Sequence, residues 1–173
     1  RVALDVAPCN QVLNHLSGQA GLSYDQDGKL AREGAPEQGL LDTLNALPFY
    51  QQTGPRSLDR SDIEHTWLPL IDKHEGTIAQ KLATFHAHLA EQIAEAIAAA
   101  PASPQSRMLV TGGGAFNRHL VQRIQQHFPG EVVVPDAQLV EFKEAVIFAF
   151  MGWLRWHNRT NCLASVTGAS QDH

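Results

Sequence analysis

The sequence has 173 residues, of which 43% are hydrophobic, and this size and composition allow one domain with a sizeable core. Its net charge of −5 argues against a general nucleic-acid-binding protein, because no positive field would attract phosphate backbones. Cys9 and Cys162 lie far apart without metal-ligand spacing, so we expect neither a disulfide framework nor a zinc site. No apolar run approaches the length of a membrane span and no leader-like segment opens the sequence, and we therefore expect a cytoplasmic protein.

The start of the chain predicts a buried strand that runs into a helix. Residues 2–6 are Val-Ala-Leu-Asp-Val, and Asn10 is the expected N-cap of the following helix, because its side chain can accept a bond from a first-turn amide. A buried strand normally pairs on both sides, and the sequence starts at Arg1 without Met. We therefore expect residues 1–173 to be one half of a larger protein; a missing N-terminal tail is the alternative.

Helical spacing of apolar residues dominates the middle of the chain. Residues 63–71 predict a short helix that is interrupted near Pro69. The clearest helix covers residues 77–99, where apolar side chains recur every three or four positions and form one stripe. His86 and His88 fall off this stripe, so we expect both imidazoles to be solvated.

The last third of the chain predicts two further strands, residues 107–111 and 131–134, separated by a helix. A final helix over residues 141–156 is apolar on most sides, which is typical of a buried helix. The order of the elements indicates an α/β domain. We predict that these two strands and residues 2–6 share one sheet, with helices packed on it.

Two segments combine a strand end, a turn and a helix start, which is where open α/β sheets bind ligands. Asp5 ends the first strand, and its carboxylate can accept a proton, orient a nucleophile or hold a hydrated Mg²⁺. The simplest alternative is that Asp5 only satisfies amides of the turn. Residues 112–114 are Gly-Gly-Gly, which lets the backbone approach a ligand closely, although a tight turn would need the same residues.

Taken in chain order, five segments resemble the 1,6-anhydro-N-acetylmuramic acid kinase family. Asp5-Val-Ala-Pro-Cys-Asn10 is similar to the family's Asp-Thr-Gly-Pro-Gly-Asn, and Gly112-Gly-Gly-Ala-Phe-Asn117 looks like its glycine-rich adenosine segment. The others are a Tyr-Asp-x-Asp turn, a Pro-Phe-Tyr and Pro-Arg-Ser pair, and the family's closing features. The resemblance implies the α/β fold of the second domain of a two-domain actin-like ATPase (ribonuclease H-like), with a mixed sheet flanked by helices.

The resemblance also implies an activity and a site. The family uses ATP to phosphorylate O6 of 1,6-anhydro-N-acetylmuramic acid while water opens the anhydro bridge, a reaction of cell-wall sugar recycling. Transferred by position, Asp5 would be the general base that activates the water, and Glu144 an acidic residue near the same water and sugar. The nucleotide would lie against Gly112, Gly113, Gly114 and Asn117. ATP and Mg²⁺ are the expected cofactors, and we expect no metal-ligand set in the chain itself.

The sequence departs from the family at two glycine positions, which are Ala7 and Cys9 here, so the backbone is more restricted there. A kinase of the same fold for another anhydro or amino sugar therefore stays open, as does a non-catalytic nucleotide-binding module. The family's first phosphate loop belongs to its N-terminal domain and does not occur in this sequence.

We therefore expect this half alone to be inactive and to need the missing N-terminal domain as a partner. The sugar and ATP are the small-molecule partners that we expect. We expect neither a nucleic acid nor a membrane partner, and a homodimer is compatible with the sequence.

Overall fold

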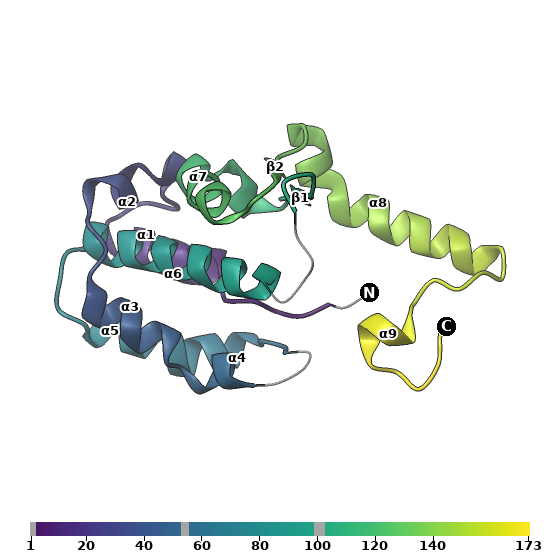
Figure 1. Ribbon diagram of the computed structural model, residues 1–173, viewed down its shortest axis with the longest axis horizontal. Coiled ribbons are helices and arrows are strands. Elements are labelled where there is room, and N and C mark those ends of the chain that lie inside the picture. Colours follow the sequence, from purple (N-terminus) through teal and green to yellow (C-terminus); the bar gives the residue numbers. More distant parts are fainter. Residues whose placement is uncertain (1–2, 53–55, 99–102) are drawn as a thin grey trace.

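The computed structural model describes residues 3–52, 56–98 and 103–173, and it is mostly helical (Figure 1). Helices α4, η3 and α5 follow one another without a break, and η3 is a π-helical turn. In chain order the elements are α1 (Asn10–Gln19), η1 (Gln26–Gly28), α2 (Lys29–Glu33), α3 (Gln38–Asn45), η2 (Pro48–Gln51), α4 (Arg60–Asp62), η3 (Ile63–Trp67), α5 (Leu68–Lys73), α6 (Ile78–Ala98), β1 (Arg107–Leu109), η4 (Gly113–Phe116), α7 (Arg118–His127), β2 (Glu131–Val133), α8 (Ala137–Trp156) and α9 (Ala164–Thr167).

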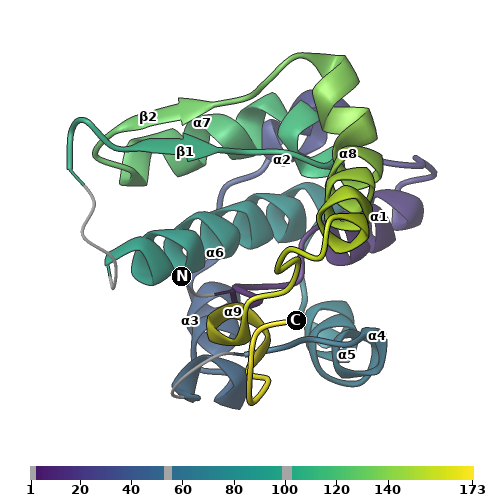
Figure 2. The same cartoon turned by 90° about the vertical axis from the view of Figure 1, so that its right-hand side faces the viewer.

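Helix α6 forms the centre of the molecule. It contacts α1, α2, α3 and α7. Figure 2 shows it between the layer of β1, β2 and α7 on one side and α3, α4 and α5 on the other. Its apolar stripe lies in one hydrophobic core with side chains from the neighbouring helices, among them Leu16, Leu44, Trp67 and Leu120. The structure confirms the helix predicted over residues 77–99, of which Ala99 lies outside the described residues.

The two described strands form a small parallel sheet, in which Met108 is opposite Val132. Helix α7 and the turn before it make the crossover that a parallel pair requires. The chain is thus a helix-dominated α/β domain, and the sheet that the structure describes is parallel rather than mixed.

The predicted first strand is wrong for residues 3–6, which form no strand, while Val2 lies outside the described residues. The amide of Asp5 instead donates to the carbonyl of Arg56 at 2.8 Å. A strand needs a neighbouring strand to satisfy its amides and carbonyls, and no strand that the structure describes pairs with this segment. An apolar run alone therefore did not make it part of the sheet.

The predicted interruption at Pro69 is also wrong, because the chain stays helical through this residue. Pro69 lies in the first turn of α5, which continues directly from η3, so the missing N–H is accommodated within a continuous helix. The π-helical turn η3 precedes it and changes the hydrogen-bonding register before the proline.

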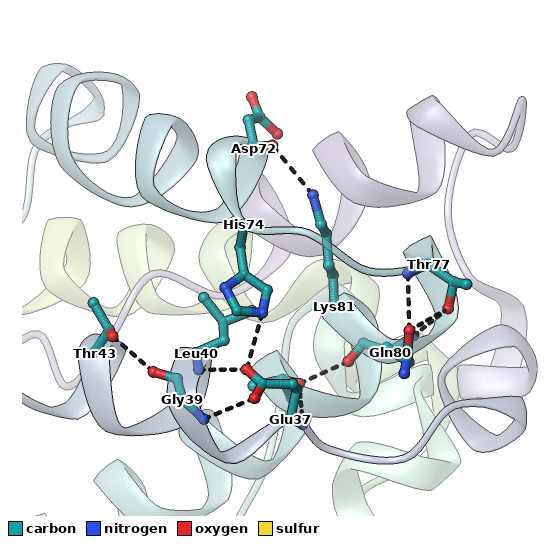
Figure 3. Close-up of polar contacts among 10 residues, drawn as sticks. Glu37, Gly39, Leu40, Thr43, Asp72, His74, Thr77, Gln80 and Lys81 are labelled. Atoms are coloured by element: carbon teal, nitrogen blue, oxygen red, sulfur yellow. Dashed lines mark hydrogen bonds and ion pairs between the residues drawn. The ribbon is translucent and has the colours of Figure 1, made fainter.

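Glu37 ties three segments together at the start of α3 (Figure 3). Its carboxylate accepts bonds from the amides of Gly39 at 3.0 Å and Leu40 at 2.6 Å, and so caps the helix. His74 approaches the same carboxylate to 2.9 Å. The backbone hydrogen bonds, followed by His74, hold the pKa of Glu37 below its ordinary value. The amide of Glu37 donates to the hydroxyl of Thr84, which anchors this segment on α6.

The last long helix, predicted over residues 141–156, is confirmed as α8, and the side chain of Asp136 caps its first turn. The prediction that it is buried is wrong for this chain, because Val140 is its only buried residue. Figure 1 shows α8 extending away from the other helices toward α9. Among the described residues, no helix combines the length and the hydropathy that a membrane span requires. The exposed large apolar side chains of α8 are Leu139, Phe142, Val146, Ile147, Phe148, Phe150, Trp153 and Trp156.

The predicted solvation of His86 and His88 is wrong, because both side chains are fully buried in α6. Neighbouring helices cover α6 on the sides away from its apolar stripe as well. His88 bonds through Nδ1 to Oδ1 of Asn45 at 2.6 Å and accepts from the hydroxyl of Tyr50 at 2.7 Å. Burial lowers the pKa of His88 from 6.5 to about 4.

The buried neutral state of His88 predicts that the stability of the protein decreases as the pH is lowered. Between pH 6.5 and about 4 the imidazole is protonated in the unfolded chain and neutral in the folded one, so protons favour unfolding. The free energy of unfolding should drop by up to about 1.4 kcal/mol per pH unit from this residue alone. Urea titrations at several pH values should show that the free energy of unfolding depends less steeply on pH in His88→Gln than in the wild type. The exposed His65→Gln is the control, and an unchanged slope for His88→Gln would contradict the assignment.

Candidate functional site

A cavity of about 870 Å³ opens between the start of α1, the turn at residues 24–27 and the η4–α7 segment. Asn10 brings an amide side chain to its wall, and Tyr24 and Phe116 bring aromatic rings that are both substantially exposed. A concave site with aromatic rings and a few polar groups suits a flat ligand with polar edges. Neither ring was predicted as a site residue, although Tyr24 belongs to the Tyr-Asp-x-Asp turn and Phe116 to the glycine-rich segment.

At two of the three predicted glycines a side chain would be strained or would crowd a neighbour. Gly112 has φ of +75°, a conformation that side chains other than glycine rarely adopt. A Cβ atom on Gly113 would lie 2.9 Å from Nδ2 of Asn10, so its absence lets η4 approach the start of α1 closely. Gly113 lines the cavity, whereas a Cβ on Gly114 would make only ordinary contacts. The glycine segment therefore shapes the wall where α1 and η4 meet.

The turn at residues 24–28 forms the opposite wall. The buried carboxylate of Asp25 accepts bonds from the amides of Leu30 and Ala31 and so holds the start of α2. Gly28 has φ of +67°, and a Cβ there would lie 2.5 Å from Cβ of His119 and 2.7 Å from Oδ1 of Asn117. Only glycine lets this turn pack against α7.

Asn117 lines the cavity, but both ends of its amide are engaged within the protein. Its Oδ1 accepts from the amide of Leu120 at 3.0 Å and caps α7, and its Nδ2 lies 2.8 Å from Nε2 of His86. The structure thus assigns Asn117 a capping role, which its position at the end of the glycine motif did not indicate. Its predicted contact with a nucleotide stays a prediction.

The two family glycines that are Ala7 and Cys9 here require no special backbone conformation in this chain. Cys9 has φ of −117°, and the non-glycine residues with positive φ among those described are Asp27 and Asn158. The prediction that Asn10 is the N-cap is wrong, because Asn10 is the first residue of α1 and Cys9 is its N-cap, without a side-chain bond to a first-turn amide. Burial raises the pKa of the Cys9 thiol to about 11, so it stays protonated and unreactive near neutral pH.

Asp5 is exposed and is fixed to the segment after the undescribed residues 53–55. Its Oδ2 accepts from the amide of Leu58 at 2.7 Å, in addition to the bond from its own amide to Arg56. Pro55, part of the Pro-Arg-Ser motif, lies outside the described residues. One backbone amide thus holds the exposed carboxylate, and a second bond fixes the backbone of Asp5.

A chain of contacts connects the Asp5 segment to α6. The guanidinium carbon of Arg56 lies 5.0 Å from the ring centre of Phe49 and 5.7 Å from that of Tyr50. Burial raises the pKa of Tyr50 to about 12, and its hydroxyl bonds to His88. The Pro-Phe-Tyr and Pro-Arg-Ser motifs thus meet in space and are anchored on the central helix.

Glu144 lies on the exposed surface of α8 and is not part of the cavity wall. No hydrogen bond or ion pair joins it to Asp5 in the part of the chain that the structure describes. Within those residues, no group of three or more acidic, histidine or cysteine side chains is placed to bind a metal ion. A Mg²⁺ ion here would need ligands from elsewhere, such as phosphate oxygens and water.

The small parallel sheet, the helical core and the glycine-lined cavity fit the ligand-binding domain of a kinase. A family model described as Anhydro-N-acetylmuramic acid kinase matches residues 1–173, and the chain belongs to this family. It is 30% identical over 97% of its length to the Anhydro-N-acetylmuramic acid kinase of Saccharophagus degradans. It is 33% identical over 98% of its length to that of Cupriavidus pinatubonensis, and 34% identical over 87% to that of Roseobacter denitrificans. The matches cover 47%, 47% and 40% of these relatives, so the chain spans about half of their length.

The different surroundings of Gly28 and Gly18 predict opposite effects of alanine substitution at the two positions. Gly28→Ala should lower the free energy of unfolding by about 1–3 kcal/mol, because the new Cβ is strained at positive φ and overlaps His119. Gly18→Ala lies inside α1, where no atom is within 4 Å of the position that the new methyl group takes, and it should raise stability by up to about 1 kcal/mol. Urea unfolding monitored by circular dichroism measures both. Equal effects of the two substitutions would contradict this account of the turn.

Proposed function

We propose that this chain is the nucleotide-binding half of a two-domain, actin-like kinase that phosphorylates 1,6-anhydro-N-acetylmuramic acid. Membership of the anhydro-N-acetylmuramic acid kinase family over residues 1–173 carries the proposal. The curated relatives are about twice as long as the chain, which supports a second domain outside it. We place the enzyme in the cytoplasm, with ATP and the sugar as its substrates.

The cavity is the proposed site for the adenosine part of ATP. Its aromatic rings, Tyr24 and Phe116, suit a purine, and the close approach of Gly113 to Asn10 leaves backbone rather than bulky side chains at the wall. The start of α1 lies at the same cavity, and the unpaired amides of a helix start favour phosphate groups. Bound ATP, with Mg²⁺ on its phosphates, supplies the phosphoryl group that is transferred.

The exposed apolar surface of α8 supports a second domain that packs against it. A helix that is hydrophobic on all sides is normally buried. In this chain, eight large apolar side chains of α8 are exposed. Phosphoryl transfer requires groups on both sides of the nucleotide to align the acceptor and exclude water. We therefore propose that this chain alone binds nucleotide without catalysing transfer.

Asp5 is the proposed general base. Its carboxylate is exposed, and the contacts to Leu58 and Arg56 hold it in one orientation, so it can take a proton from a water molecule that attacks the anomeric carbon. The oxygen released from the anhydro bridge then accepts the phosphoryl group. Glu144 keeps its proposed role near this water on the strength of the family resemblance alone, since it lies on the α8 surface that the second domain would cover.

Two alternatives differ in what the site would accept. Ala7 and Cys9 replace glycines beside the Asp5 segment, so a kinase for another anhydro or amino sugar remains a candidate. A non-catalytic nucleotide-binding module would keep the cavity and need no general base. Turnover measured with 1,6-anhydro-N-acetylmuramic acid against related sugars separates all three.

Nucleotide binding tests the cavity directly. Phe116→Ala should weaken the binding of an ATP analogue to the chain roughly 5- to 100-fold, because stacking of a base on an aromatic ring contributes about 1–3 kcal/mol. Phe142→Ala is the matched control, since this exposed ring lies on α8 outside the cavity. Isothermal titration calorimetry gives both affinities, and the same preparation with ATP and sugar should release no ADP. Equal affinity of the two variants would place the nucleotide elsewhere.

The role of Asp5 is tested in the full-length protein. Asp5→Asn keeps an oxygen that can accept the Leu58 amide but cannot take a proton, so the turnover number should fall on the order of 10²- to 10⁴-fold. Nucleotide affinity should stay the same, because Asp5 is not part of the cavity wall. Asp42→Asn, on the exposed surface of α3, is the control for a lost surface charge. Wild-type turnover of Asp5→Asn would end the base assignment, and a defect that excess Mg²⁺ restores would make Asp5 a metal-positioning residue.

A further inference from the structure

His86 is a buried imidazole whose hydrogen-bonding state is set by its own helix. Its Nδ1 lies 2.8 Å from the carbonyl oxygen of Leu82, one turn earlier in α6. A carbonyl oxygen can only accept, so Nδ1 carries the hydrogen and Nε2 of the neutral ring is an acceptor. Burial, as the largest effect, lowers the pKa of His86 and keeps this neutral form.

The acceptor Nε2 determines which way the amide of Asn117 points. At 2.8 Å from Nε2, the amide nitrogen Nδ2 must donate to it, which leaves Oδ1 facing the first turn of α7. There Oδ1 accepts from the amide of Leu120 at 3.0 Å. With the amide turned over, an oxygen would face the Nε2 lone pair and an NH₂ group would face an N–H. Both bonds would be lost together.

The oriented amide supports two walls of the cavity. Asn117 follows the glycine segment and is the N-cap of α7. Gly113, Phe116 and Asn117 all line the cavity. The turn at Gly28 packs against Asn117 and His119, because a Cβ on Gly28 would lie 2.7 Å from Oδ1 of Asn117 and 2.5 Å from Cβ of His119. The hydrogen bond from α6 thus supports the η4–α7 wall, and the turn that faces this wall packs on the same Asn117 together with His119.

We propose that His86 is a positioning residue of the nucleotide site, acting through Asn117. The inference rests on the proposed binding of nucleotide in this cavity. His86 does not line the cavity and does not touch the ligand; it selects the one amide orientation of Asn117 that caps α7 and supports the cavity. Its effect is therefore on nucleotide affinity, through the shape of the site.

The test compares variants at position 86 with the other buried histidine of the same helix. His86→Leu removes the acceptor and keeps the bulk, and it should weaken binding of a non-hydrolysable ATP analogue to the full-length protein about tenfold. His86→Gln can place an acceptor near the position of Nε2 and should bind within about threefold of the wild type. His88→Leu removes an imidazole of equal burial whose partners are Asn45 and Tyr50, so it should lower stability and leave nucleotide affinity unchanged.

If His86→Leu does not fold, His86→Asn and His86→Gln replace it as a pair. Asn can still donate to Leu82 but is too short to reach Asn117, so it should bind nucleotide about tenfold more weakly than Gln. Thermal unfolding without ligand gives the stability of each variant.

Wild-type affinity of His86→Leu would overturn the inference and leave the proposed function standing. So would equal weakening by His86→Leu and His88→Leu, which would indicate a general loss of stability. Failure of the Gln variant to bind better than the Leu or Asn variant would overturn it as well. A wild-type protein that binds no nucleotide would overturn the proposed function first and the inference with it.

Discussion

Ten consecutive buried residues in the middle of α6, residues 81–90, impose one constraint on the rest of the structure: every polar group on this stretch needs a partner from within the protein. The hydroxyl of Thr84 accepts a hydrogen bond from the amide of Glu37, and the imidazole of His88 is hydrogen-bonded to Asn45 and Tyr50. His86 bonds to Asn117. These bonds hold three segments, so α3, the turn at η2 and the start of α7 are all positioned from one helix.

Because of their spacing, His86 and His88 connect α6 to two different segments of the protein. Side chains two residues apart on an α-helix point to different sides, which excludes a shared metal ion and sends the imidazoles to separate segments. His86 leads to Asn117 and the cavity, whereas His88 leads through Tyr50 and Arg56 to the segment that holds Asp5. In the proposed reaction the nucleotide and the general base therefore share one rigid frame, and phosphoryl transfer depends on such mutual positioning.

Helix α8 differs from α6 in what covers it. Both are long and rich in apolar residues, yet α6 is enclosed and α8 exposes large side chains such as Phe148 and Trp156 along its length. The chain spans about half the length of its curated relatives, and in the proposed two-domain protein the other half would cover this helix. Glu144 lies on the same exposed helix, and its side chain makes no hydrogen bond or ion pair with the described residues.

The sequence alone determined the features that depend on neighbours along the chain. The helical period of residues 77–99 predicted α6, apolar runs predicted β1 and β2, and ordered motifs predicted the family that the comparison with relatives confirmed. A glycine at positive φ, such as Gly112, is likewise a local requirement. The predicted roles of Asp5, Glu144 and the nucleotide contacts stay predictions, because they concern ligands and a domain outside this chain.

Only the tertiary structure decided the features that depend on residues far apart in the sequence. A helical stripe identifies the face that packs first but not the helices that cover the other faces, so the burial of His86 and His88 could not be inferred from it. The family resemblance predicted Asn117 as a nucleotide contact, and its bond to His86, 31 positions away, could not be inferred from the sequence. Residues 3–6 have the composition of a strand but no neighbouring strand in the described chain, and pairing, unlike helical periodicity, requires a second segment to be present.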